Sequence, residues 1–135
     1  MKLKEILTEG LNRQQAEKII HKFLEFVKDE LELNKLPSVN LITNNDYSLK
    51  YKSFGGYNPN DKSIHVVIYI RHIQDILRST AHELTHYKQD LNGELKHDSG
   101  EDGSPQENEA NSTAAVLMRK WGRQHPSLFG YSSVE

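Results

Sequence analysis

With 135 residues, the chain is long enough for one hydrophobic core, so we expect a single domain over 1–135, with a lead at 1–10 and a tail at 122–135. The formal net charge of −2, with basic residues interspersed among acids, argues against nucleic acid as a partner, and the absence of cysteine excludes disulfides and thiolate metal ligands. No apolar run is long enough to span a membrane and the start lacks signal-peptide features, so we expect a cytoplasmic monomer with no membrane partner.

The first half of the chain predicts one helix followed by three strands. Asn12 and Gln15 form an N-cap signal, and the apolar residues after them recur at helical spacing as far as Leu31. Apolar alternation predicts strands at 39–43, 47–53 and 63–70, and the glycine-rich stretch 55–61 reads as a turn. We expect an α+β fold with a three-stranded, mainly antiparallel sheet, and surface positions for His21 and His65.

A second helix is predicted from about His72 to Leu91, and it carries an HExxH motif. Four residues make slightly more than one helical turn, so His82 and His86 stack on one face, away from the apolar stripe, and can share a Zn²⁺ ion. Glu83 lies beside them, placed as a general base toward a water activated by the metal. Two solvent-facing histidines on an ordinary amphipathic helix are the alternative interpretation.

A third helix is predicted to begin at Ser104 and Pro105, an N-cap residue followed by a first helical residue. On its helical wheel Glu107 faces the apolar stripe, whereas Glu109 faces water. A carboxylate on a packing face is costly unless it is paired or binds metal, which favours Glu107 as the third ligand. A capping box between Ser104 and Glu107 is the competing interpretation.

These residues resemble the gluzincin-type zinc metallopeptidases, which carry HExxH on one helix and a glutamate ligand in E-x-x-A-[DN] at the start of another, here Glu107 to Asn111. The segment from about Ser79 to Arg119 is similar to minigluzincins, to ImmA/IrrE-like peptidase domains and to small zincin-like proteins of tailed phages. The resemblance implies a zincin-like domain, a Zn²⁺ cofactor, a peptide or protein substrate and, for a phage protein, the host cytoplasm. It further implies that Asn111 holds a metal-binding histidine and that an edge strand pairs with extended substrate.

Other zincin classes fit less well. A metzincin needs a glycine and a third histidine where this chain has Gln89 and Asn92. SprT-like proteases, which act on DNA-bound proteins, use a third histidine, and His97 lies in a polar loop. A zincin-fold module that binds metal or a partner without cutting also remains open, although such a site needs no base.

The expected chemistry also needs a donor to stabilise the oxyanion. Tyr131, His125 and Tyr87 are candidates, although the apolar phase of Tyr87 places that residue in the core. The tail at 122–135 follows the ligand-bearing helix directly, and an inhibitory plug over the cleft is a second interpretation of it.

Overall fold

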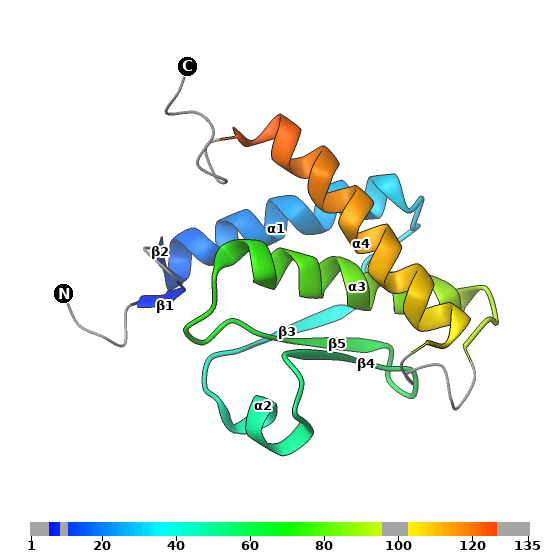
Figure 1. The fold of residues 1–135 in the computed structure, drawn as a ribbon, viewed down its shortest axis with the longest axis horizontal. Coiled ribbons are helices and arrows are strands. Elements are labelled where there is room, and N and C mark those ends of the chain that lie inside the picture. The colour runs from blue at the N-terminus through cyan, green and yellow to red at the C-terminus, as the bar shows by residue number, and fades with distance from the viewer. Residues whose placement is uncertain (1–5, 9–10, 96–102, 127–135) are drawn as a thin grey trace.

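The computed structural model describes residues 6–8, 11–95 and 103–126. Four α-helices and two small sheets make up this part of the chain (Figure 1). The helices are α1 (Arg13–Glu30), α2 (Asp46–Tyr51), α3 (Ile73–Leu91) and α4 (Pro105–Gln124). The strands are β1 (Ile6–Thr8), β2 (Leu11–Asn12), β3 (Ser38–Ile42), β4 (Gly55–Asn58) and β5 (Ser63–Val67).

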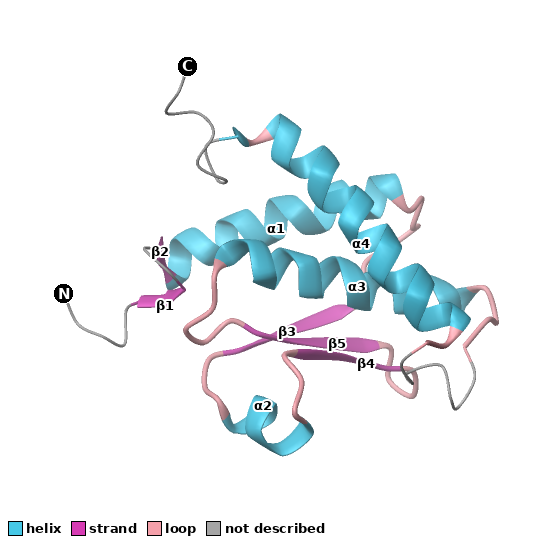
Figure 2. Ribbon diagram, in the orientation of Figure 1, coloured by secondary structure: helices cyan, strands magenta, loops and turns pink. Residues whose placement is uncertain are grey.

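The larger sheet has the order β3-β5-β4 and is mixed. β5 pairs with β3 in parallel and with β4 antiparallel, so the expectation of a mainly antiparallel sheet was wrong. The central strand β5 is covered on both faces, since Ile64, Val66 and Val67 are all buried. Figure 2 shows α3 lying along one side of this sheet and the short α2 on the other.

The expected second strand, at 47–53, was also wrong. Residues 46–51 form α2, and the strand lies in the glycine-rich stretch that had been read as a turn. The Asp46 backbone N–H donates to the Asn44 side chain, and Ser48 donates to the Asn45 carbonyl, so polar side chains support the backbone of a helical turn here. The apolar residues that suggested alternation remain in water, because Leu49 is 71% exposed.

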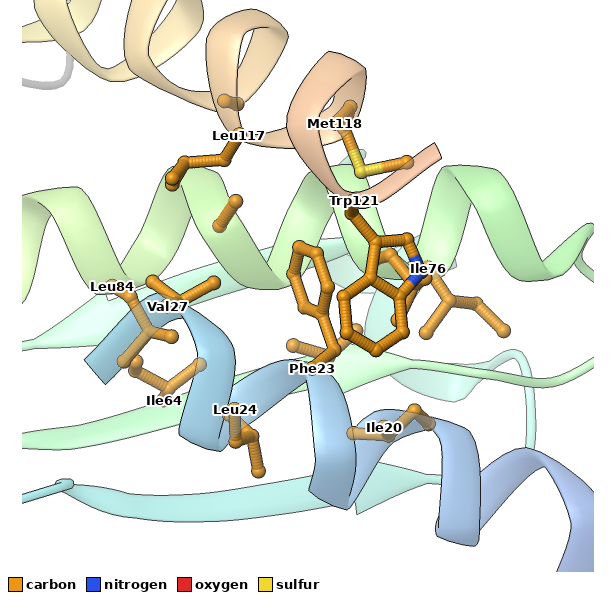
Figure 3. Packing of buried hydrophobic residues seen from close by; sticks show 14 of the residues in the cluster. Ile20, Phe23, Leu24, Val27, Ile64, Ile76, Leu84, Leu117, Met118 and Trp121 are labelled. Atoms are coloured by element: carbon orange, nitrogen blue, oxygen red, sulfur yellow. The ribbon is translucent and has the colours of Figure 1, made fainter. Parts of the chain in front are cut away.

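The three long helices α1, α3 and α4 follow the sequence expectations closely. The Asn12 and Gln15 side chains form a reciprocal capping box at α1, and α3 begins one residue after His72, its N-cap. Their apolar faces meet α4 in one core, where the Phe23 and Trp121 rings pack edge to face at 5.1 Å (Figure 3). No helix within the described ranges is long and apolar enough to cross a membrane.

Two smaller expectations have clear outcomes. The third expected strand was too long, because β5 ends at Val67 and Ile70 adopts a positive φ of 49°. His21 is exposed, as expected. His65 is half-buried on β5, where its ring contacts the Asn40 and Ser63 side chains, and it does not join the HExxH residues.

Candidate metal centre

Three side chains from two helices converge at the centre of the molecule. The His82 and His86 rings, one turn apart on α3, have centroids 4.8 Å apart. Glu107, in the first turn of α4, places Oε1 2.9 Å from His82 Nε2 and Oε2 3.1 Å from His86 Nε2. One ligand atom from each residue lies within 4.8 Å of the others, so this group could hold a metal ion.

The donor set fits a borderline metal such as Zn²⁺, which takes imidazole nitrogen and carboxylate oxygen in tetrahedral sites. All three side chains are largely shielded from water, because the exposed fraction is 17% for His82, 10% for His86 and 19% for Glu107. Burial lowers the pKa of His82 below its ordinary value, against the opposing charge of Glu107. The neutral imidazole that burial favours is the form that binds metal.

The start of α4 positions Glu107 without using its side chain as a cap. The Glu107 backbone N–H donates to Ser104 Oγ at 3.0 Å, while its carboxylate reaches the two histidines. Behind it, Ala110 and Ala114 are fully buried and let α4 approach α3 closely. The Ser104 cap and the histidine contacts of Glu107 therefore occur together.

A glutamine that the sequence analysis did not single out orients one histidine. Gln89 is 2% exposed, and its Oε1 lies 2.8 Å from His86 Nδ1. Its Nε2 donates to the Gln106 carbonyl at 3.0 Å and to Glu109 Oε1 at 2.7 Å. The signal was available, because a residue three positions after His86 lies on the same helical face.

The other histidine is held from α4. The Asn111 side chain lies near enough to His82 to raise its pKa, against the burial that lowers it, and the resemblance implied a contact between these two residues. Each candidate ligand histidine thus has an amide side chain at its side, Asn111 for His82 and Gln89 for His86. Such partners fix the orientation and tautomer of a metal-binding imidazole.

Glu83 lies beside the group and is not part of it. Its side chain packs toward β4, where a Cβ added to Gly55 would lie 3.5 Å from Glu83 Oε2. Burial, followed by the negative charge of Glu107, raises the pKa of Glu83 to about 8. A carboxyl group in this position can both hold and release a proton near neutral pH.

A cleft of about 740 Å³ opens at this carboxyl group. Glu83 and His82 line its inner end, and exposed Phe54 and Ile70 line the outer part. Arg71 and Arg78 also line the cleft, and neither was among the sequence candidates. The cleft gives an extended ligand access to the group from one side.

Two of the expected oxyanion donors, Tyr87 and His125, lie in the described residues and are not brought to the group. Tyr87 is buried in the core with its hydroxyl 3.3 Å from the Lys35 carbonyl, as its apolar phase had indicated. His125 stacks on Trp121 at 3.7 Å, at the opposite end of α4 from Glu107. His97 and Tyr131 lie outside the described residues, as does most of the expected tail.

Comparisons of the chain with known protein families, with curated proteins and with solved structures gave no match.

Proposed function

We propose that this protein is a zinc-dependent metallopeptidase of the gluzincin type, with His82, His86 and Glu107 as metal ligands and Glu83 as general base. The observation that carries the proposal is the position of Glu83, a buried carboxyl group with a raised pKa next to the three-residue group and open to the cleft. A purely structural metal site needs ligands and has no use for such a group.

The ligand set supports this choice of metal and reaction. Two imidazoles and one carboxylate are the ligand types of catalytic zinc sites, which keep a fourth position open. A zinc ion held there would polarise a carbonyl group and increase the acidity of water. The amide partners Asn111 and Gln89 would keep both imidazoles in the ligating orientation.

Glu83 supplies the proton transfers in this proposal. In its ionised form the carboxylate accepts a proton from the water that attacks the peptide carbonyl. The same carboxyl group then donates that proton to the departing amide nitrogen, which leaves as an amine. Burial favours the protonated carboxyl group that the second transfer needs, and the charge of a bound zinc ion would favour the carboxylate that the first transfer needs.

The free edge of β4 supports a peptide as the substrate. The Val67 N–H donates to the Phe54 carbonyl, so alternation along the antiparallel pair turns Gly56 toward β5 and Gly55 toward the free edge. Ser53 Oγ contacts both the N–H and the C=O of Gly55, at 3.3 and 2.7 Å. An extended peptide would replace this hydroxyl with its own backbone groups.

The deciding experiment compares zinc-loaded wild-type protein with Glu83→Gln on a broad peptide library. We expect the variant to keep its zinc and to cleave about 10²- to 10⁴-fold more slowly, the usual effect of removing a general base. Glu25→Gln, at an exposed position of α1, is the matched control and should cleave like wild type. Equal cleavage by wild type and Glu83→Gln would reject the role of Glu83, and zinc binding without any cleavage would leave a metal-binding module.

A further inference from the structure

A second groove adjoins the cleft. It has a volume of about 460 Å³, lies between α3 and α4, and is lined by Arg78, Arg119 and Arg123 together with Met118 and Ala115. Arg78 lines both this groove and the cleft at the metal centre, so the two meet at its side chain. Glu83 lines the first of these two hollows, and the C-terminal half of α4 lines the second.

The arginines along the two grooves carry positive charge that Asp75 neutralises only in part. Arg71 donates to two backbone carbonyls and to Ser79 Oγ, and its guanidinium stacks on the Phe54 ring at 4.5 Å. These partners are neutral and fix the side chain, and the carboxylate of Asp75 acts on its charge without forming an ion pair with it. Arg78 lies 3.6 Å from Asp75, but both are more than half exposed, so the pair is weak.

The second groove is the more strongly cationic of the two. Its lining contains three arginines and no acidic residue. Within the described ranges, no carboxylate lies at ion-pair distance from Arg119 or Arg123. The chain as a whole has a formal charge of −2, so this concentration of cations runs against the overall balance.

Helix geometry gives the spacing of these charges. Arg78 precedes His82 by one turn, about 6 Å along α3, whereas Arg119 and Arg123 lie about 18 and 24 Å beyond Glu107 along α4. An extended peptide covers about 3.3 Å per residue. Carboxylates about two, five and seven residues from the scissile bond would therefore lie near the three arginines.

We propose that the substrate is an extended acidic peptide segment, which runs from the metal centre past Arg78 into the groove between α3 and α4. The proposal rests on the peptidase function above and adds the substrate class to it. Guanidinium groups bind carboxylates through paired N–H donors, and Met118 and Ala115 offer apolar contact between them. Nucleic acid is the less favoured ligand, because no aromatic residue for base stacking lines the second groove.

Binding is measured by fluorescence anisotropy at low salt on zinc-loaded Glu83→Gln, which is expected to cleave too slowly to consume the probe during the measurement. The probes are a labelled 16-residue peptide with glutamates on one side of a central apolar pair, its mirror arrangement, and versions with Gln for Glu. We expect the better Glu peptide to bind about tenfold more tightly than its Gln version, the effect of two or three partly exposed ion pairs. Equal affinity of the Glu and Gln versions in both arrangements would overturn the proposal.

The arginines are tested by adding Arg119→Gln and Arg123→Gln together, which should reduce the preference for glutamate to about twofold. The matched control adds Arg13→Gln and Lys18→Gln, two exposed positions of α1 that remove the same charge and should preserve the preference. If the control loses the preference for glutamate, the effect comes from net charge. If the groove variant keeps the preference, the effect comes from another surface. A thymidine oligonucleotide of equal charge that competes as well as the acidic peptide would overturn the peptide assignment.

Cleavage by the wild type separates this proposal from the proposed function. Peptide cleavage without preference for acidic sequences would leave the peptidase function and reject the acidic substrate. Selective binding of the acidic peptide without cleavage of any peptide would reject the peptidase function and leave an acidic-peptide binding groove.

Discussion

Gln89 Oε1 lies 2.8 Å from His86 Nδ1, almost one turn further along α3, and so accepts the proton on that nitrogen. This contact turns His86 Nε2 toward Glu107. The donor end of the amide is bonded to Gln106 and Glu109 at the start of α4, so the same side chain fixes His86 and joins the two helices. Gln89 is buried, and replacing it would leave these groups without their partner.

The first prediction concerns this glutamine. Gln89→Leu should weaken zinc binding by about 10- to 100-fold, as loss of a hydrogen-bond partner behind a ligand histidine usually does. The measurement is a zinc titration against a competing chelator dye. Gln14→Leu, at an exposed position of α1, is the control, and equal affinities of the two variants would contradict the positioning role.

The second prediction concerns the third ligand. Glu107→Ala should lose most of its zinc, because it removes the oxygens that face both histidines. The Ser104 cap uses the backbone N–H of residue 107, so α4 should stay helical in the variant. Metal analysis beside circular dichroism tests both statements. Glu25→Ala, at an exposed position of α1, is the control. A variant of Glu107 with full zinc, or zinc loss confined to Glu109→Ala, would show that the ligand is assigned wrongly.

The third prediction concerns pH and the zinc-free protein. The folded state holds a proton on Glu83 up to a pKa of about 8, whereas the unfolded chain releases it near the ordinary value of 4.5. The folded state therefore binds more protons between these values, and Glu83 lowers stability progressively as pH rises through them. The substitution Glu83→Gln removes this fall of stability with rising pH.

We expect zinc-free Glu83→Gln to be more stable than zinc-free wild type by about 3 kcal/mol at pH 8.5, with little difference at pH 4.5. Urea unfolding of both proteins at the two pH values measures the difference. A gap that stays constant between them would show that the pKa of Glu83 is not raised in the folded state.

The fourth prediction concerns the hydrogen bonds of Asp90 at the C-terminal end of α3. Asp90 Oδ2 accepts from Tyr57 at 2.6 Å and from Lys62 at 2.9 Å, which ties the β4–β5 hairpin to the helix. Burial acts to raise the pKa of Asp90, but the hydrogen bonds from Lys62 and Tyr57 and the charge of Lys62 outweigh it and lower the pKa. The stabilisation is therefore present above the pKa of the unfolded chain and lost as pH falls through the lower folded value.

Asp90→Asn should accordingly lower the free energy of unfolding by about 1–2 kcal/mol at pH 7 and by less at pH 3. Urea unfolding at the two pH values tests this, with Asp29→Asn, at an exposed position of α1, as control. A deficit of the same size at both pH values would show that the charge of Asp90 does not supply the stability.

The three long helices, and the faces on which the three candidate ligands lie, could be predicted because both depend on local spacing. The turn between His82 and His86 fixes their common face, and the phase of Glu107 relative to Ala110 and Ala114 points its carboxylate inward. Each inference needs only the helical period, which holds whatever packs nearby. Gln89 obeyed the same rule but was not singled out.

The strand errors had a different origin. Tyr47, Leu49 and Tyr51 alternate with polar residues, yet no strand among the described residues pairs with this segment, and its local hydrogen bonds favour a helix. Gly55 and Gly56 are of a residue type common in turns, but they lie in strand β4. Their backbone pairs with β5, and Tyr47 and Glu83 approach it closely. Strand pairing of this long-range kind cannot be predicted from a local sequence pattern. The position of Arg78, which lines both grooves, could not be predicted from a local pattern either.

The candidate ligands lie on two helices, and His86 on the first is separated from Glu107 on the second by 21 residues of sequence. A metal bound by both helices would act as a reversible cross-link. In an unfolded chain that still holds the ion, this cross-link would keep the loop between His86 and Glu107 closed. Closing a loop of this length is worth about 3 kcal/mol in chain entropy, comparable with a disulfide, in a protein that has no cysteine to form one. Removal of the ion would then release the first turn of α4 before the core around Trp121 opens, so chelation should expose this helix to proteases first.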